Sequence, residues 1–344
     1  MKPEVKPEIL FLKQEDVVKA GLLDMKAVLA AVELTYKMFG EGKIINHPKV
    51  STKIPDEKNW TSFFNSMPSY IGGDINVAGI KWACEATGNL DVEGLPWGID
   101  SIILSDPATV LPVAYMDGTL ITAMRTSAVG GVFAKYTAPK GCKRAALIGA
   151  GVIGRTMVMA ICESVPTIEE LLLVDLDIKK AEELVEEFKT VYPNVKIIPS
   201  TDVAAAAKTA PLIVTQTTSR KDLITPDMVQ KGNTVINMSS DVSIEVMRMA
   251  DQIFLDYFMQ MVSNKIKGIV DLHASGELTM DNVVEMKDLT QGLHPGRKND
   301  EETIYCGSMG FASLDIMVAN TIYQNAKKMG IGQKLQLWDK ALWV

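Results

Sequence analysis

Cysteine and histidine are scarce in this sequence of 344 residues, and their scarcity excludes several kinds of site. The four cysteines are widely separated and form no C-x-x-C pair, so neither a zinc site nor a disulfide framework is indicated. The three histidines, His47, His273 and His294, are too scattered for a histidine metal cluster. We therefore expect reduced thiols and no metal site.

Long apolar runs and a basic excess are also missing. No run approaches the roughly 18 to 20 residues that cross a bilayer, and the N-terminal segment lacks the apolar core of a signal peptide. The net charge is −7, whereas electrostatic binding to a phosphate backbone requires a clustered basic excess. We expect a cytosolic protein that binds neither nucleic acid nor membrane.

A glycine-rich turn near the middle of the chain is the most informative feature that is present. A short apolar run breaks into Gly149, Gly151 and Gly154, in the dinucleotide pattern G-x-G-x-x-G, with Val152 and Ile153 inside the loop. The first glycine permits a tight turn, the second lets the backbone approach a pyrophosphate, and the third lets the helix lie close to the strand. Free N–H groups at the start of that helix then bind the pyrophosphate.

An acidic residue follows at the spacing that this pattern requires. The second apolar run, 171–174, ends in Asp175, about 20 residues beyond the last glycine, where a β-α-β unit places the acid that binds the adenosine ribose hydroxyls. A carboxylate there repels a 2′-phosphate, and Asp177 adds the same sign of charge, whereas Lys179 and Lys180 oppose it. The sequence predicts NAD as the cofactor, with NADP as the alternative.

The segment before the glycine turn differs in the periodicity of its apolar residues. Apolar residues recur at helical spacing over 25–38. Three shorter runs, 76–82, 101–105 and 111–116, are typical of strands, and a turn sequence joins the last two. This pattern favours an α+β domain with a mostly antiparallel sheet.

Beyond the glycine turn, short buried-type strands alternate with helices, which is typical of a doubly wound parallel sheet. A final amphipathic helix over 314–328 is expected to return to the first domain. The predicted fold class is therefore α/β, with a central Rossmann dinucleotide-binding domain over 124–310. An α+β domain occupies 1–123 and 311–344.

Three cations fall where predicted strands or helices end: Lys49, Lys81 and Arg125. Lys81 has alternating apolar neighbours, so it either faces solvent or faces a cavity in which it meets an anion or acts as a perturbed amine. Arg125 has small neighbours that admit a ligand, and a guanidinium suits bidentate carboxylate binding. An interdomain salt bridge is the alternative for Arg125.

Two acidic residues lie at the ends of predicted elements. Asp241 follows a parallel strand at its C-terminal end, where doubly wound sheets bind ligands, and capping of the next helix is its alternative role. Asp315 lies near the start of the last helix, where we expect a cap or an interdomain contact rather than a catalytic residue.

Motifs along nearly the whole chain carry a family resemblance. They occur at 47–50, 65–68, 79–82, 117–129, 149–154, 215–219, 237–241 and 308–315. In this order they resemble the ornithine cyclodeaminase and mu-crystallin family, which includes archaeal-type alanine dehydrogenases, ketimine reductases and related amino-acid and opine-type dehydrogenases. The motifs are specific for the family and much less specific for one member.

The resemblance implies roles for the residues singled out above. Lys49, Lys81 and Arg125 bind the substrate carboxylate, and Asp241 exchanges a proton with the reacting nitrogen, while Lys81 can also activate water for imine hydrolysis. Asn65 stands in the substrate site where the cyclodeaminases carry a glutamate that meets the distal amine of ornithine. A neutral amide pairs poorly with a buried ammonium, and Lys49 replaces the arginine typical of cyclodeaminases, so ornithine is less favoured.

The resemblance also extends to the cofactor site and to assembly. It implies that Thr215 and Thr217 contribute to the cofactor site, and that the domain over 1–123 and 311–344 binds substrate and forms a homodimer.

Three functions follow as hypotheses. The leading one is an NAD-dependent oxidoreductase that interconverts a small or N-substituted α-amino acid with its imine or 2-oxo acid. The second is a cyclodeaminase-type lyase that uses NAD catalytically to make proline and ammonia. The third is a crystallin-like protein that binds a nucleotide without turnover.

Overall fold

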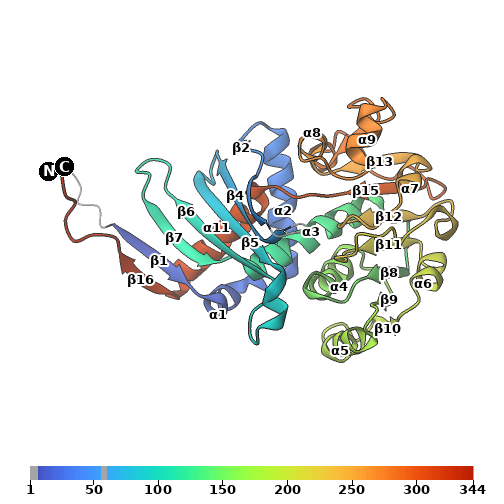
Figure 1. The fold of residues 1–344 in the computed structure, drawn as a ribbon, viewed down its shortest axis with the longest axis horizontal. Coiled ribbons are helices and arrows are strands. Elements are labelled where there is room, and N and C mark those ends of the chain that lie inside the picture. Colours follow the sequence, from blue (N-terminus) through green and yellow to red (C-terminus); the bar gives the residue numbers. More distant parts are fainter. Residues whose placement is uncertain (1–6, 56–59, 344) are drawn as a thin grey trace. The chain divides into compact units, whose positions relative to one another are not determined.

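The structure is a computed structural model that describes residues 7–55 and 60–343, so the N-terminal segment considered as a signal peptide lies largely outside the described residues. Contacts divide the chain into two compact units, and each is built around an eight-stranded sheet (Figure 1). The predicted α/β class is confirmed. The first unit comprises Met1–Asp24, Glu41–Arg125 and Phe311–Val344, and the second comprises Met25–Gly40 and Thr126–Gly310.

The first unit contains the mostly antiparallel sheet that the sequence predicts. Its elements are β1 (Glu8–Leu12), α1 (Gln14–Val17), η1 (Val18–Leu22), β2 (Ile44–Asn46), β3 (Val50–Pro55), β4 (Trp60–Ile71), β5 (Val77–Ala86), η2 (Thr87–Asp91), β6 (Gly98–Ser105), β7 (Pro112–Asp117), the start of α3 (Thr119–Thr137), α11 (Ala312–Met329) and β16 (Gln333–Gln336). The strand order is β16-β1-β7-β6-β5-β4-β2, with β3 also paired to β4. Only β1 and β7 pair in parallel among these strands.

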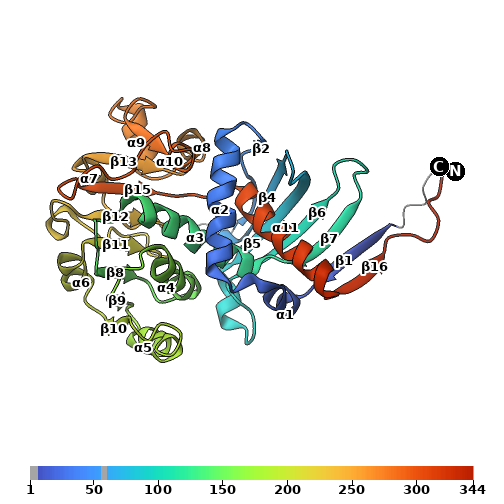
Figure 2. The ribbon, with the colours of Figure 1, turned by 180° about the vertical axis from the view of Figure 1, so that it is seen from behind.

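Helix α11 covers one face of this sheet, as Figure 2 shows. A Cβ at Gly79 of β5 would lie 2.7 Å from Cδ1 of Ile316 in α11 and 2.8 Å from the backbone carbonyl oxygen of Ile103, so this position faces the helix and requires glycine. Alternate residues of a strand point to opposite faces, so every second residue of β5 shares the face of Gly79. That face therefore carries Lys81.

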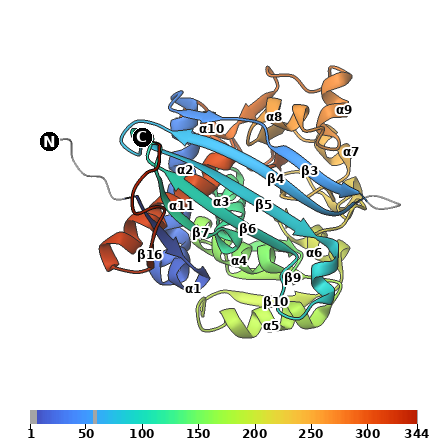
Figure 3. The same ribbon diagram turned by 60° about the vertical axis from the view of Figure 1, so that its left-hand side comes forward.

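The opposite face of the sheet carries exposed apolar side chains on the strands that Figure 3 brings forward. Trp82, Ile99 and Tyr115 are each at least 40% exposed, and they come from β5, β6 and β7. Phe64 of β4 stacks on Trp82 with ring centroids 5.7 Å apart. Exposed aromatic and branched side chains on neighbouring strands form an apolar surface that favours association.

The second unit contains an all-parallel sheet in the order β10-β9-β8-β11-β12-β15-β13-β14. The order reverses between β8 and β11, which defines the switch point where doubly wound sheets bind ligands. Its elements are α2 (Met25–Gly40), β8 (Arg144–Ile148), α4 (Val152–Ser164), β9 (Glu170–Val174), α5 (Ile178–Phe188), β10 (Lys196–Ser200), α6 (Val203–Thr209), β11 (Leu212–Thr215), η3 (Pro226–Met228), β12 (Thr234–Asn237), α7 (Ile244–Arg248), β13 (Gln252–Leu255), α8 (Phe258–Ser263), α9 (Ile269–Ala274), β14 (Val283–Glu285), α10 (Met286–Thr290) and β15 (Ile304–Gly307).

The division of the chain differs from the predicted one in a single helix. We expected α2 to belong with the residues around it in sequence, but it packs on α10 and α4 of the second unit. Its Glu33 accepts hydrogen bonds from Lys135 at 2.8 Å and from Tyr136 at 2.5 Å, both on the later part of α3. Amphipathic periodicity marks a buried face without naming its partner, so sequence order suggested the wrong neighbour.

The described residues contain neither a membrane-spanning helix nor a metal-binding cluster. Across residues 7–55 and 60–343, no helix is both long and apolar enough to span a membrane. Within the same ranges, no cluster of three or more histidine, cysteine or acidic side chains is arranged to hold a metal ion. The four cysteines are free thiols.

Candidate functional site

The glycine turn of the second unit has the geometry that a dinucleotide loop needs. Gly149 has φ +109°, a conformation that L side chains rarely adopt. A Cβ at Gly154 would lie 2.1 Å from the carbonyl oxygen of Gly149, so helix α4 can approach the strand only with glycine there. A Cβ at Gly151 would meet no heavy atom within 4 Å. The loop is therefore tight beneath the helix and open at its N-terminus.

The first turn of α4 offers unused donors. Its N-cap, Gly151, provides no side-chain hydrogen bond to the helix, and Val152 and Ile153 follow as the first helical residues. Backbone N–H groups of a first helical turn have no partner within the helix, and the helix dipole makes that end positive. The turn is suited to an anion such as a pyrophosphate.

Asp175 follows β9 and is tied to the glycine turn. Its Oδ2 accepts the backbone N–H of Ala150 at 2.8 Å, and its Oδ1 accepts that of Asp177 at 3.0 Å. A carboxylate oxygen accepts more than one hydrogen bond, so both oxygens retain capacity for ribose hydroxyls. Asp177 itself caps α5 through the backbone N–H of Lys179, so its carboxylate also serves the helix.

Thr215, the last residue of β11, and Thr217, just beyond it, join a buried polar network. The Thr215 hydroxyl donates to Oδ1 of Asn237 at 3.3 Å, and the Thr217 hydroxyl donates to Oδ2 of Asp241 at 2.6 Å. Ser239 donates to the other oxygen of Asp241, also at 2.6 Å. The network links the ends of the neighbouring strands β11 and β12.

Asp241 is fully buried and its role as a helix cap is not observed. Its exposed fraction is 0%, and both carboxylate oxygens accept hydroxyl groups. Helix α7 begins later than the sequence suggested, and Ser243 caps it through the N–H of Glu245. The capping alternative was therefore wrong, because a serine two residues on takes that position.

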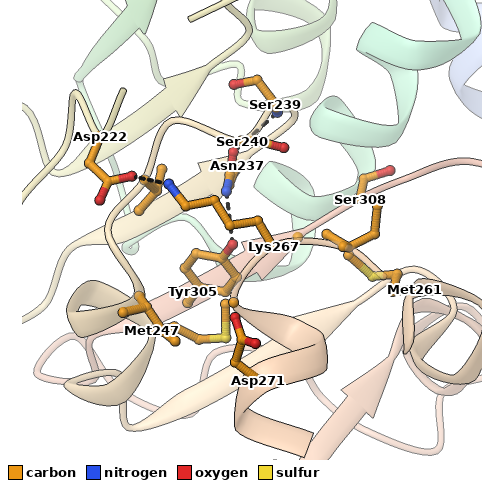
Figure 4. A pocket seen from close by; sticks show the side chains of 15 residues that line it. Asp222, Asn237, Ser239, Ser240, Met247, Met261, Lys267, Asp271, Tyr305 and Ser308 are labelled. Atoms are coloured by element: carbon orange, nitrogen blue, oxygen red, sulfur yellow. Dashed lines mark hydrogen bonds and ion pairs between the residues drawn. The ribbon is translucent and has the colours of Figure 1, made fainter. Parts of the chain in front are cut away.

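A pocket of about 110 Å³ lies at the carboxyl ends of β12 and β15 (Figure 4). Asn237 donates to the hydroxyl of Tyr305 at 2.9 Å on its wall. Asp241 is not part of the lining, although its neighbours Ser240 and Val242 are. This is the edge of a doubly wound sheet at which ligands bind.

In the first unit, Lys81 is buried in a charged cluster rather than exposed to solvent. Only 2% of the side chain is exposed. Its Nζ donates to Oδ1 of Asp315 at 3.0 Å and to the Thr122 hydroxyl at 3.3 Å, and lies 3.9 Å from Oδ2 of Asp100. The solvent-facing alternative for this lysine was wrong.

Arg125 joins the same cluster from helix α3. Its Nε donates to Oδ1 of Asp315 at 2.8 Å, and the side chain is 8% exposed. Its two Nη groups have no hydrogen-bond partner within the described part of the chain. An ion pair inside the first unit replaces the interdomain salt bridge that was the alternative. The planar Nη fork remains available for a carboxylate.

Asp315 is the centre of this cluster and was misjudged from the sequence. It is the fourth residue of α11 and 0% exposed, and α11 has no side-chain cap, so it neither caps the helix nor bridges the two units. Its Oδ1 accepts both Lys81 and Arg125, whereas its Oδ2 has no partner. Burial opposes ionisation of Asp315, but Arg125 and Lys81 outweigh burial and hold its pKa below the ordinary value.

Burial shifts the two other titratable groups of the cluster away from their charged forms. It lowers the pKa of Lys81, with Arg125 adding to the effect and Asp315 opposing it. Burial also raises the pKa of Asp100, against the attraction of Lys81. The Thr122 hydroxyl donates to Asp100 at 2.5 Å and completes the network. Sequence reasoning missed Asp100 and Thr122.

Strand register places further polar residues on the face that carries Lys81. Ala83 lies opposite Asn65 of β4 on one side and opposite Asp100 of β6 on the other. Residues directly opposite in an antiparallel pair share a face, as do alternate residues of one strand. Asn65, Asp100 and Glu85 therefore surround the small side chain of Ala83 on the face that α11 covers.

Lys49 and Glu85 extend this charged region. Glu85 is half-buried, and burial with repulsion from Asp100 raises its pKa, while Lys49 and Lys81 oppose the shift. Lys49 is therefore near enough to act on Glu85. Asn65 accepts a hydrogen bond from the Ser51 hydroxyl. Glu85 was missed because one acid at the end of a strand carries no motif.

The sequence-predicted residues thus form two groups. Lys49, Asn65, Lys81 and Arg125 lie in the first unit. The glycine turn, Asp175, Thr215, Thr217 and Asp241 lie in the second unit.

Comparison with known proteins shows the family to which this chain belongs. The model of the ornithine cyclodeaminase/mu-crystallin family matches residues 8–330, and the chain belongs to that family. It is 30% identical over 334 residues to N-((2S)-2-amino-2-carboxyethyl)-L-glutamate dehydrogenase of Staphylococcus aureus, covering 96% of this chain and 99% of that protein. It is also 30% identical over 346 residues to the alanine dehydrogenase of Archaeoglobus fulgidus, covering 96% of this chain and 99% of that protein.

Solved structures show the same fold. Delta(1)-pyrroline-2-carboxylate reductase of Thermococcus litoralis, in complex with NADH and L-proline, matches with a TM-score of 0.84 and 29% identity over 94% of this chain and 99% of that chain. An archaeal alanine dehydrogenase dimer with bound NAD matches with a TM-score of 0.83 and 28% identity over 96% of this chain and 100% of that chain. The resemblance inferred from the motifs is confirmed.

Proposed function

We propose that this protein is an NAD-dependent oxidoreductase that interconverts a small or N-substituted α-amino acid with its imine or 2-oxo acid. The observation that carries the proposal is the buried pair of cations, Lys81 and Arg125, sharing one oxygen of Asp315. Asp315 takes only the Nε of Arg125, so the cluster has a charged guanidinium fork to offer to an organic acid. The named activities of the relatives, all acting on amino acids or imines, support the same chemistry.

The residues of the glycine turn fit NAD. The open space at Gly151 and the free first turn of α4 suit the pyrophosphate, and Asp175 retains acceptor capacity for the ribose hydroxyls. Thr215 and Thr217, at the end of β11, border the switch point of the sheet. Bound NAD accepts a hydride from carbon in amino-acid oxidation, and NADH returns it in imine reduction.

Substrate binding is assigned to the polar face of the first unit. The free Nη fork of Arg125 suits the substrate carboxylate, and Lys49 and Lys81 add positive charge. Asn65 offers an amide to the remainder of the substrate. Holding the carboxylate fixes the orientation of the Cα atom, which is the main contribution such residues make to the rate.

Proton exchange with the substrate nitrogen is assigned first to Lys81. Burial lowers the pKa of Lys81, which suits an amine that takes up and returns a proton at Nζ. Asp241 is the second group proposed for this role. It is less favoured, because its side chain is fully buried and both oxygens already accept hydroxyls.

A spectrophotometric screen tests the proposal. Purified protein is given NAD with L-alanine, L-proline, L-aspartate, L-glutamate or L-ornithine, and NADH with 2-oxo acids plus ammonia or methylamine. We expect a change in NADH absorbance with at least one amino acid and its imine or 2-oxo acid. Proline and ammonia from L-ornithine without stoichiometric NADH indicate the lyase instead. NAD binding with no turnover of any compound indicates a non-catalytic protein.

We further propose that the protein is a cytosolic homodimer assembled through the first unit. The exposed apolar face that includes Trp82, Ile99 and Tyr115 supports this, as does the dimeric state named for the archaeal alanine dehydrogenase. Analytical ultracentrifugation of the wild type and of a Trp82→Glu variant tests it. A wild-type monomer at micromolar concentration contradicts the assembly.

A further inference from the structure

We propose that Asp315 is a positioning residue that aims Arg125 at the substrate carboxylate and makes Lys81 the proton-exchanging group of the cluster. This inference rests on the proposed function, since it assigns a task within that reaction. It goes beyond that function because Asp315 acts through its two cations and has no assigned contact with substrate or cofactor.

The location of Asp315 shows that its charge is retained for its partners. It lies in α11 between Leu314 and Ile316, which are both fully buried. An unpaired carboxylate in such a helix face is strongly destabilising, whereas pairing and hydrogen bonding compensate for the lost hydration. Asp315 therefore depends on Lys81 and Arg125 for its charge, and the two cations depend on it for their positions.

The division of hydrogen bonds fixes the direction of Arg125. Asp315 takes only the Nε of the guanidinium, at 2.8 Å, and leaves both Nη groups without a partner among the described residues. Because the guanidinium is planar and rigid, holding Nε determines where the Nη fork points. Asp315 thus orients the fork without occupying the atoms that suit a bidentate carboxylate.

The same contact determines which cation can lose a proton. Arginine stays protonated in proteins, so the negative charge of Asp315 is permanently balanced by Arg125. Lys81 is the other cation of the cluster, and it shares its surroundings with Arg125, Asp100 and Glu85 as well as Asp315. Lys81 is therefore the cation of the cluster that can lose its proton, and its burial favours that loss.

The unpartnered Oδ2 of Asp315 gives Lys81 a second position. Oδ1 accepts Lys81 and Arg125, whereas Oδ2 is buried and empty. An ammonium has three donors, and Lys81 uses two of them on Asp315 and Thr122. The third donor is available to a ligand, and the empty Oδ2 is a second acceptor beside it.

The test compares Asp315→Asn with Asp100→Asn, a matched loss of a buried acid beside the same lysine. For each variant, kcat and KM are measured from pH 6 to 10.5 with the amino acid of the panel that the wild type oxidises fastest. Asp315→Asn removes a negative charge 3.0 Å from Nζ of Lys81. The apparent pKa of Lys81 in the pH profile of kcat should therefore fall by about 1–3 units, and kcat should fall at least tenfold. Asp100→Asn should lower this apparent pKa less than half as far, because Asp100 lies 3.9 Å from Nζ of Lys81 and its own pKa is raised.

Several outcomes overturn the inference. If the apparent pKa of Lys81 is unchanged in Asp315→Asn, or falls equally in both variants, Asp315 has a structural role only. Turnover by the wild type in that case preserves the proposed function. Absence of turnover by the wild type overturns the proposed function and this inference together.

A second variant covers the possibility that Asp315→Asn does not fold. The double variant Lys81→Met with Asp315→Asn removes one cation together with the acid. Where Asp315→Asn shows no cooperative urea transition, the double variant should show one, and where both unfold cooperatively the double variant should have the higher midpoint, because fewer uncompensated charges remain buried. A double variant that also fails to fold contradicts the pairing. A midpoint equal to or below that of the single variant contradicts the pairing on which the inference depends.

Discussion

Asp315 and Asp241 are two fully buried carboxylates, one in each unit of the chain, and their partners differ completely. Asp315 accepts two cations on one oxygen and leaves the other oxygen empty. Asp241 accepts one neutral hydroxyl on each oxygen, from Ser239 and Thr217. Among the described residues, the first cluster leaves the Arg125 Nη groups and Oδ2 of Asp315 without partners, whereas in the second each oxygen of Asp241 has one.

This difference indicates that the cluster of Asp315 is suited to binding a ligand and that the network of Asp241 stabilises the fold. Unused donors and an empty acceptor each cost stability, and they are retained where a ligand satisfies them. The hydroxyl network of Asp241 fixes the ends of β11 and β12, because each oxygen of its fully buried carboxylate already has a partner. We therefore expect chemistry to depend more on the cluster of Asp315 than on Asp241.

The largest effect is expected from Lys81→Met, which removes the titrating amine from the cluster of Asp315. Turnover should fall by about 10²–10⁴-fold, the usual contribution of a positioned acid or base. NADH binding, followed by fluorescence, should be unchanged because the glycine turn belongs to the other unit. Lys53→Met, at an exposed lysine of β3, is the matched control and should retain full activity.

Stability sharpens the comparison between the two acids. Asp315→Asn leaves two buried cations without their carboxylate and should cost about 3–5 kcal/mol in urea unfolding. Asp241→Asn keeps an amide between two hydroxyls that can reorient, so its cost should be about 1–2 kcal/mol. The comparison fails if Asp241→Asn proves the more damaging substitution.

A smaller effect is expected at Asp175, whose carboxylate serves both the cofactor and the loop. Asp175→Asn removes the charge that repels a 2′-phosphate but keeps an acceptor for the N–H of Ala150, so NADPH should bind roughly tenfold tighter relative to NADH, or about 1.4 kcal/mol. Asp175→Ala also loses that acceptor and should weaken both cofactors. Titration of each variant with NADH and NADPH measures both effects. Tighter binding of NADPH than NADH by the wild type contradicts the assignment of NAD.

Local signals made the second unit more predictable from sequence. The glycine turn, the strand ending at Asp175 and the helix after it all lie within a short stretch, so their order alone predicted a parallel nucleotide-type sheet. In the first unit, β4 was not recognised, because it lacks clean alternation and contains Pro68, which weakens a strand prediction. Its partners became clear only from register.

The candidate site shows the same limit. Lys81 and Arg125 were selected from their local surroundings, but their shared partner lies 234 and 190 residues away along the chain. A sequence pattern does not specify which distant helix packs against a strand, so Asp315 was read from its position in the helix alone. The empty Oδ2 of Asp315 and the free Nη groups of Arg125 result from tertiary packing, which no local sequence pattern specifies.

Strand β16 has a practical consequence for anyone shortening this protein. It lies antiparallel to β1 at the margin of the first sheet, with all four residues exposed. A truncation before Gln333 removes this edge strand, and the backbone of β1 is then exposed to strand addition by another molecule. Trimmed versions made for crystallisation should therefore keep this stretch, or they will tend to aggregate even with every catalytic group in place.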